Sequence, residues 1–193
     1  MVRRREFDVE QALDAAMQLF WEKGYEAASL SDLTSAMGIQ RPSLYAAFGD
    51  KQGLFEAALR KYTQAHALAL RSILHSKTSV KESFRSLFEG LVEAEYAGNR
   101  NRGCFCINTI VELAPHDEKF EVLTREHQMY LAAIFQEAIE RGRKAGELEP
   151  GENDKALAQT LVVSLIGLTV MMKARPPRTM ADHCVEVTLT LLK

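Results

Sequence analysis

The sequence predicts an all-α protein of about nine helices, arranged as a small N-terminal domain and a larger C-terminal one. Apolar residues recur at intervals of three and four along most of the 193 residues, and this is the spacing of one face of a helix. The alternation typical of a half-buried strand is not found before residue 75. With 47% apolar and 26% charged residues, the composition is that of a globular chain that can bury a core.

Charge and cysteine content narrow the class of protein. The net charge is −2, so any affinity for nucleic acid must come from a few placed cations rather than from bulk charge. Three cysteines give no even-numbered disulfide framework and favour a reducing compartment. No apolar signal core follows the N-terminal arginines, and the longest apolar run, residues 161–172, is too short to span a bilayer. We therefore expect a cytoplasmic protein with no membrane partner.

A helix-turn-helix pattern occupies residues 29–51. Ser29, followed three residues later by Asp32, forms a capping box that starts a helix. Gly38 stands where the chain must turn, because glycine reaches left-handed φ values at little cost. Pro42 is tolerated in the first turn of the next helix, where its missing N–H costs nothing. Two short helices joined by a tight glycine turn are the plan of a DNA-binding helix-turn-helix.

The same periodicity predicts the remaining helices. One precedes the pattern, spanning residues 8–23 and stopping at Gly24. Gly49 ends the second helix of the pattern, and Asp50 caps the next one. We place the domain boundary there, so that residues 1–50 form the DNA-binding domain and residues 51–193 the C-terminal domain. The further helices are expected at residues 51–74, 84–92, 104–114, 117–146, 155–174 and 180–192.

The N-terminal third resembles the DNA-binding domain of the tetracycline-repressor (TetR) family. The resemblance covers roughly residues 8–60 and rests on the segments LFWEKGYEAASL, MGIQ and SLYAAFGDKQGLF. A second segment, RGCFCINTIVELAPHD, is similar to a recurrent feature of one branch of that family. The resemblance implies an all-α homodimer that binds a palindromic operator. It also implies that a small molecule bound in the C-terminal domain changes the separation of the two DNA-binding domains.

The candidate DNA-binding residues surround the second helix of the pattern. Arg41 can pair bidentately with guanine and Gln40 with adenine, while alanine methyl groups can contact thymine. The resemblance adds Tyr45 and Lys51 as phosphate contacts, although the family usually has a small capping residue where Gln40 stands. Free N–H groups at the start of the helix that begins near Ser29 can also bind phosphate. The full set is Ser29, Ser31, Gln40, Arg41, Pro42, Ser43, Tyr45, Ala46, Ala47 and Lys51.

Three arginines precede the first helix, at residues 3–5. An arm of this kind can reach a phosphate or the minor groove, which attracts arginine. The alternative is a frayed tail that only interacts with solvent.

Cys104 and Cys106 are the candidate redox residues. Cys104 follows Gly103 near the start of a helix, where the helix dipole lowers the pKa of a thiol, and Arg100 and Arg102 would strengthen that effect. Side chains two positions apart on a helix point in nearly opposite directions, which serves neither a shared metal nor a mutual disulfide. The alternative is that both cysteines are small core residues.

An effector pocket is expected among the apolar residues of the C-terminal domain, beside a few polar groups. Most of the phenylalanine and methionine residues in this domain are expected to belong to the hydrophobic core. The five histidines lack metal-ligand spacing, and no nucleophile–base pair or phosphate loop is recognisable, so we expect no metal, no cofactor and no enzyme. The candidate pocket residues are Phe88, Cys104, Phe105, Asn108, Glu112, His127, Tyr130 and Met171.

The last two helices are the candidate dimer interface. Residues 155–174 are apolar nearly all round, and a helix of this kind is buried on most sides. Packing of both helices on their symmetry mates would bury them in a four-helix interface. Burial within a single chain is the alternative. The candidate interface residues are Leu161, Ser164, Leu165, Gly167, Leu168, Val187 and Leu191.

Together these features predict a homodimeric DNA-binding regulator, in the first place a repressor released by a small apolar or electrophilic molecule. Two alternatives stay open. In one, chemical modification of Cys104 is the trigger that releases DNA. In the other, the chain is a helical protein–protein interaction module whose DNA-binding head is degenerate.

Overall fold

The computed structural model describes residues 7–98, 102–151 and 153–193. Nine α-helices and no strand occur within these ranges, which confirms the predicted all-α fold. Every predicted helix is present, with ends that differ by a few residues. The helices are α1 (Val9–Lys23), α2 (Leu30–Met37), α3 (Arg41–Phe48), α4 (Lys51–His75), α5 (Val80–Ala97), α6 (Phe105–Glu112), α7 (Glu118–Lys144), α8 (Asp154–Met172) and α9 (Arg178–Leu189).

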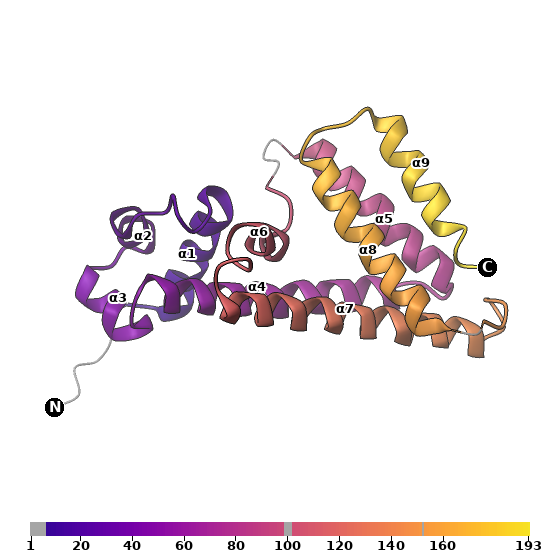
Figure 1. Cartoon of the computed structure of the whole chain (residues 1–193), viewed down its shortest axis with the longest axis horizontal. Coiled ribbons are helices and arrows are strands. Elements are labelled where there is room, and N and C mark those ends of the chain that lie inside the picture. The colour runs from indigo at the N-terminus through magenta and orange to yellow at the C-terminus, as the bar shows by residue number, and fades with distance from the viewer. Residues whose placement is uncertain (1–6, 99–101, 152) are drawn as a thin grey trace.

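Two long helices, α4 and α7, lie side by side and connect the two ends of the molecule (Figure 1). The helices α1, α2 and α3 gather at the N-terminal end of α4. At the opposite end, α5, α8 and α9 pack on one another, and α5 and α8 also pack on the long pair. The short helix α6 lies between the two groups and contacts both α4 and α7. Helix α6 therefore contacts both of the helices that run between the two ends of the molecule.

The first of two buried hydrophobic clusters lies at the N-terminal end and is rich in aromatic rings. We call it the N-terminal cluster. Phe55 of α4 lies at its centre and makes edge-to-face contacts with Phe20, Tyr25, Phe105 and Phe120. Its buried members are Ala12, Leu13, Ala16, Phe20, Ala28, Leu33, Met37, Leu44, Leu54, Phe55, Ala58, Leu59, Tyr62, Cys104, Phe105, Cys106, Leu113, Phe120 and Leu123.

The second cluster, the C-terminal cluster, is mainly aliphatic and fills the space between α4, α5, α7, α8 and α9. Its aromatic pair is Phe84 and Phe135, whose ring centroids are 5.2 Å apart. Its buried members are Ala67, Leu70, Leu74, Val80, Phe84, Leu87, Phe88, Val92, Leu131, Ile134, Phe135, Ala138, Ile139, Leu148, Ala158, Leu161, Val162, Leu165, Leu168, Met172, Ala181, Val185 and Leu192.

Helix α4 contributes to both clusters. Its residues from Leu54 to Tyr62 belong to the N-terminal cluster, and its residues from Ala67 to Leu74 belong to the C-terminal one. The two buried cores therefore separate within α4, beyond the start of that helix. The domain boundary between residues 50 and 51 stays a prediction.

Helix α8 buries only one of its sides. Leu161, Leu165 and Leu168 are 0–6% exposed within their own chain, where α8 packs on α7, α5 and α9. The expectation that these three leucines lie at a dimer contact is therefore wrong, because their spacing of four and three residues directs them into the chain's own core. The opposite side of α8 is exposed and includes Val163 and Val170, at 68% and 47%.

By length and composition alone, α8 is also long and apolar enough to span a membrane. Core helices of soluble proteins share this property, and the leucines on one side of α8 are buried in the C-terminal cluster.

Candidate nucleic-acid interface and internal cavity

Helix α2 begins with the predicted capping box. The Ser29 hydroxyl accepts the Asp32 N–H at 3.0 Å, and the Asp32 carboxylate accepts the Ser29 N–H at 3.2 Å. Lys23 forms an ion pair with Asp32 at 3.1 Å, which connects the end of α1 to this cap. Gly38 ends the helix in the left-handed conformation, with φ 65°. The start of α2 is therefore fixed relative to α1, and the exposed Ser31 lies in its first turn.

Helix α3 presents an open face. Leu44 anchors it, fully buried, while Arg41 and Tyr45 are exposed on the outer side. Gln40 is its N-cap residue and makes no side-chain cap hydrogen bond. The outer side chains are thus held on a fixed helix but keep their polar ends available for a partner. Pro42 and Ala46 are also exposed there, and Ser43 and Ala47 are half-buried.

Lys51 follows α3 at the start of α4. Its Nζ lies 4.4 Å from the centre of the Tyr25 ring and 3.5 Å from the Glu26 carbonyl oxygen. These contacts hold a half-buried cation beside the α1–α2 connection. The predicted arginine arm at residues 3–5 lies outside the described residues.

The position of α1 on α4 is held by charge as well as by apolar packing. Lys61 of α4 forms ion pairs with Glu10 at 2.9 Å and with Asp14 at 2.6 Å. The neighbouring acids raise the pKa of this lysine, although its burial opposes the shift. Helix α1 is consequently fixed to the first half of α4.

A cavity of about 380 Å³, which is partly open to solvent and which we call the internal cavity, lies between α4, α5, α6, α7 and α8. Most of its lining is apolar, and its walls include Leu70, Leu91, Ile110 and Leu165. Polar groups reach it from α4 (Tyr62, His66), α5 (Glu95), the start of α6 (Cys104) and α7 (His127, Gln128). A small apolar cavity with a few polar groups is the usual form of a ligand site.

Two histidines from different helices meet at this cavity. The Nδ1 of His66 and the Nε2 of His127 are 3.1 Å apart, a hydrogen-bond distance. Burial lowers the pKa of each histidine to about 4. Both imidazoles are therefore neutral near pH 7, and the ring of Tyr62 stacks on that of His66.

The two cysteines of α6 are buried, and the expected activation of Cys104 is wrong. Cys104 is indeed the N-cap residue of α6, but burial raises the pKa of its thiol, and the helix start does not reverse that effect. The Tyr62 hydroxyl donates a hydrogen bond to its sulfur at 3.3 Å. Burial also raises the pKa of the Cys106 thiol. Arg102 stacks over Trp21 instead of Cys104, and Arg100 lies outside the described residues.

Comparisons with known proteins identify the family. The family model for bacterial regulatory proteins of the tetR family matches residues 12–58, and that for the tetracyclin repressor-like C-terminal domain matches residues 81–187. The chain belongs to the TetR family. It is a DNA-binding transcriptional regulator of the helix-turn-helix type, from a family of regulators and not of enzymes.

The chain is similar to TetR family members over its whole length. It is 34% identical to the HTH-type regulator YezE of Bacillus subtilis, with 100% of each chain covered. It is also 34% identical to the HTH-type transcriptional repressor ComR of Escherichia coli, over 87% of this chain and 80% of ComR. Among solved structures it is similar to a cysteine mutant of CifR, a TetR family regulator complexed with 26-bp double-strand operator DNA. That structure has a TM-score of 0.84 and 34% identity and covers 99% of this chain and 100% of CifR.

The predicted pocket residues of this TetR family chain do not gather around one cavity. Cys104 and His127 line the internal cavity. Phe88 and Phe105 are buried in the two hydrophobic clusters, and Tyr130 lines a separate groove between α4 and α7. These three are corrections to the predicted pocket. So is Met171, which packs against the C-terminal cluster.

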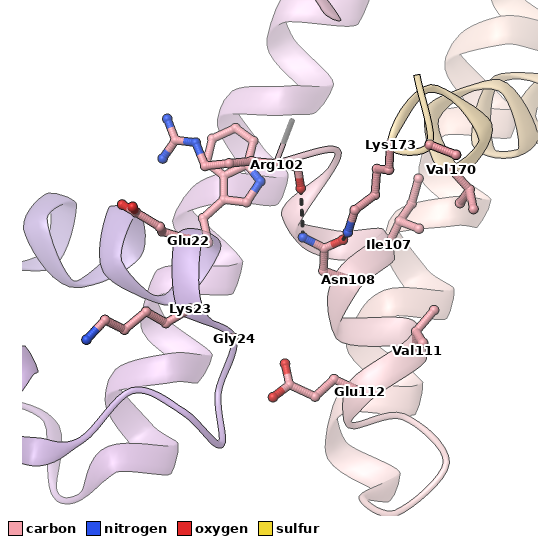
Figure 2. Close-up of a pocket in the computed structure, with 12 residues that line it drawn as sticks. Glu22, Lys23, Gly24, Arg102, Ile107, Asn108, Val111, Glu112, Val170 and Lys173 are labelled. Atoms are coloured by element: carbon pink, nitrogen blue, oxygen red, sulfur yellow. Dashed lines mark hydrogen bonds between the residues drawn. The ribbon is translucent and has the colours of Figure 1, made fainter. Parts of the chain in front are cut away.

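Asn108 and Glu112 are the remaining corrections, since they line an open cleft of about 730 Å³ between α1, α6 and the end of α8 (Figure 2). Asn108 donates to the Arg102 carbonyl at 3.0 Å and accepts from Lys173 at 2.8 Å. Across the cleft, the Trp21 indole donates to the Gly103 carbonyl at 3.0 Å. The cleft is therefore crossed by contacts that connect α1 with the start of α6.

Glu112 itself forms a latch between α6 and the DNA-binding head. Its carboxylate points toward Gly24 in Figure 2 and accepts the N–H groups of Tyr25 at 3.0 Å and Glu26 at 2.9 Å. Gly24 has φ +82°, and a Cβ there would lie only 2.9 Å from a carboxylate oxygen of Glu112. Glycine is required here both by the backbone conformation and by the approach of the carboxylate.

Sequence reasoning missed Tyr62, His66 and Glu95 as cavity residues. Tyr62 and His66 are four positions apart on α4, so one helix face carries both. That spacing was readable, but nothing local in the sequence directs this face toward His127, which is 61 positions away.

Proposed function

We propose that this TetR family chain is a repressor that binds a palindromic operator as a homodimer and is released by a small molecule bound in the internal cavity. The exposed face of α3, with Gln40, Arg41 and Tyr45, supports the DNA-binding part. The solved complex of CifR with operator DNA supports the same use of the fold. In a dimer, two copies of α3 would enter major grooves about 34–36 Å apart on one face of the DNA. Such a repressor acts in the cytoplasm.

The test of this interface is operator binding by variants of α3. A double-stranded operator is first selected from random DNA with the full-length protein. Arg41→Ala removes a bidentate base contact worth about 1–3 kcal/mol, so we expect operator affinity to fall roughly 5- to 150-fold. Tyr45→Ala should weaken binding to operator and unrelated DNA alike, because a phosphate contact carries no base information.

The matched control is Arg125→Ala, which removes an exposed arginine that pairs with Glu121 on α7. Its operator affinity should equal that of the unmodified protein. If Arg41→Ala and Arg125→Ala bind alike, α3 does not read the operator. If no operator can be selected at all, the result favours the alternative, in which the chain is a helical protein–protein interaction module with a degenerate DNA-binding head.

The dimer interface that we propose is the exposed side of α8 and α9. TetR regulators are dimers. Val163 on α8 and Val187 on α9 are 68% and 69% exposed, and Leu191 beyond α9 is 42% exposed. Gly167 is also exposed on α8 and would allow a partner helix to approach closely, while Ser164 is half-buried beside it. The buried leucines of α8 then support this surface from within.

Placing a charge on this surface tests the interface. Val163→Glu should shift the protein from dimer to monomer in sedimentation equilibrium, because an unpaired carboxylate cannot be buried cheaply. Met129→Glu is the control, since Met129 is 67% exposed on α7, outside the proposed interface. If the Val163→Glu protein remains a dimer, the interface lies elsewhere on the molecule.

Coupling between cavity and DNA is supported by the shared helices. Tyr62 and His66 line the cavity from α4, whose first half packs in the N-terminal cluster. Cys104 and Ile110 line it from α6, which Glu112 latches to the DNA-binding head. A ligand releases the operator only if it binds the DNA-free arrangement more tightly than the DNA-bound one.

A further inference from the structure

A series of contacts connects helix α1 of the DNA-binding head to the segment that precedes α6. The Trp21 indole N–H donates to the Gly103 carbonyl at 3.0 Å. The guanidinium carbon of Arg102 lies 4.8 Å from the centre of the Trp21 ring, and the same guanidinium donates to the Gln18 side chain at 2.8 Å. Two residues of α1 are therefore bonded to two consecutive residues of the segment.

The other side of this segment is attached to the end of α8 (Figure 2). Lys173 is the C-cap residue of α8, and its Nζ donates to the Asn108 Oδ1 at 2.8 Å. The Asn108 Nδ2 donates in turn to the Arg102 carbonyl at 3.0 Å. This orientation of the amide is the one that satisfies both partners, because an ammonium group only donates and a carbonyl oxygen only accepts.

Glycine is required at residue 103 for this attachment. Gly103 has φ +62°, and a Cβ there would lie 2.9 Å from the Lys173 side chain. The aliphatic stem of Lys173 therefore lies directly on the backbone of the segment, while its charged end reaches Asn108. We call the whole set of contacts the α1–α8 joint, and its residues are Gln18, Trp21, Arg102, Gly103, Asn108 and Lys173.

The joint bears on the distance between the two heads of a homodimer. If two chains pair through the exposed side of α8, the separation of their α3 helices depends on how firmly each head is attached to its own α8. The ion pairs of Lys61 and the ring contacts of Phe55 attach the head to α4. The joint adds a path of hydrogen bonds from the head to α8 itself.

We propose that the α1–α8 joint determines the selectivity of this chain for the spacing of its operator half-sites. One extra base pair between two half-sites moves one of them by about 3.4 Å and turns it by about 35° around the DNA axis. Heads that are firmly attached to the dimer cannot follow this displacement, whereas loosely attached heads can. The proposal rests on the homodimeric operator binding proposed above and adds the residues that set the spacing.

The selected operator and a version with one extra base pair between its half-sites test the joint. Fluorescence anisotropy gives the dissociation constant of each full-length variant for both DNAs, and we call their ratio the spacing penalty. A smaller folded fraction cancels from this ratio, because both constants come from the same protein. For the unmodified protein we expect a penalty of about 100-fold, since a rigid dimer loses most of the specific contacts of one half-site.

Asn108→Ala should lower the spacing penalty about tenfold, which equals about 1.4 kcal/mol, because it removes two hydrogen bonds of the joint from each protomer. Trp21→Phe keeps a ring beside Arg102 but removes the N–H that binds Gly103. Its penalty should fall less, about threefold, because Arg102 still donates to Gln18.

Val111→Ala is the matched control. Val111 lies on α6 in the same cleft, is 74% exposed and has no polar side-chain atom, so its truncation leaves the hydrogen bonds of the joint in place. The spacing penalty of this variant should equal that of the unmodified protein. An equal fall in Val111→Ala and Asn108→Ala would overturn the proposal, because it would assign the effect to the cleft in general.

The remaining outcomes separate the joint from the proposed function. A palindromic operator whose spacing penalty is unchanged in Asn108→Ala and Trp21→Phe overturns the role of the joint alone. So does an unmodified protein that binds both DNAs equally well. If the selected DNA contains a single half-site, the homodimeric function proposed above fails, and the role of the joint fails with it.

Discussion

The two hydrophobic clusters of this TetR family chain are built in different ways. The N-terminal cluster joins α1, α4, α6 and α7 through aromatic rings, and the ring of Phe55 contacts four others. The C-terminal cluster joins long helices through aliphatic side chains, with one aromatic pair at Phe84 and Phe135. The short helices α2 and α3 add only the aliphatic side chains of Leu33, Met37 and Leu44 to the buried part of the N-terminal cluster.

This difference makes the DNA-binding head, formed by α1, α2 and α3, dependent on helices from the rest of the molecule. The rings around Phe55 come from α1, α6, α7 and the α1–α2 connection, so the head is completed by helices that also border the cavity. The C-terminal cluster, in contrast, contains no buried residue from the first three helices. A disturbance of α6 should therefore affect the head before it affects the far end of the molecule.

The largest expected effect is that of truncating the central ring of each cluster. Phe55→Ala and Phe135→Ala both remove a fully buried ring, and each should lower the free energy of unfolding by about 3–5 kcal/mol. Urea denaturation measures this loss. Only Phe55→Ala should also weaken operator binding at a temperature where both variants retain their helical circular dichroism. Equal loss of operator binding in the two variants would show that the clusters are not separate in function.

Acid should destabilise the boundary between the clusters, where His66 and His127 meet. The pKa of each is lowered to about 4 in the folded chain, whereas an unfolded histidine takes up a proton near pH 6.5. The unfolded state therefore binds more protons below pH 6.5, and the free energy of unfolding falls as the pH drops from about 6.5 toward 4. The upper limit of the slope is about 1.4 kcal/mol per pH unit for each histidine.

Urea denaturation at pH 7.5, 6.0 and 5.0 measures this slope. The variant carrying both His66→Phe and His127→Phe should show a smaller slope over the same range. Glu95 acts in the opposite direction, because its raised pKa removes stability as the pH rises, and it is present in both proteins. Because the double variant keeps the exposed histidines, any difference in slope comes from His66 and His127. An unchanged slope would contradict the inference that these two histidines are neutral in the folded chain.

Local features of the DNA-binding head were predictable from sequence, whereas the contact of His66 with His127 at the boundary between the two clusters was not. The capping box at Ser29 and the left-handed Gly38 depend on residues within a few positions of each other, so their pattern is visible in the chain. The partner of His127 is 61 positions away, and only the packing of α4 on α7 brings the two together. Cys104 shows the same limit, because a rule about helix starts predicts a lowered pKa, while burial by distant residues raises it.

The latch between α6 and the head should have an intermediate effect. Glu112→Gln removes the charge that strengthens the bonds to the Tyr25 and Glu26 N–H groups and replaces one acceptor oxygen with a donor. We expect a loss of about 1–2 kcal/mol in the free energy of unfolding, reduced by the partial exposure of the site. Amide hydrogen exchange should increase at residues 25 and 26. Glu126→Gln, an exposed position on α7, is the control, and a latch that matters only locally would leave operator binding unchanged in Glu112→Gln.

The smallest expected effect lies within the head itself, at the cap of α2. Ser29→Ala removes the acceptor of the Asp32 N–H and should lower the free energy of unfolding by about 1 kcal/mol. Ser35→Ala, an exposed serine late in the same helix, should change it much less. Because Ser29 is also a candidate DNA-contacting residue, stability is measured without DNA and operator affinity is measured separately. A fall in affinity larger than the loss of stability would indicate that the start of α2 contacts the operator directly, whereas equal stability of the two variants would mean that the aromatic cluster alone positions α2.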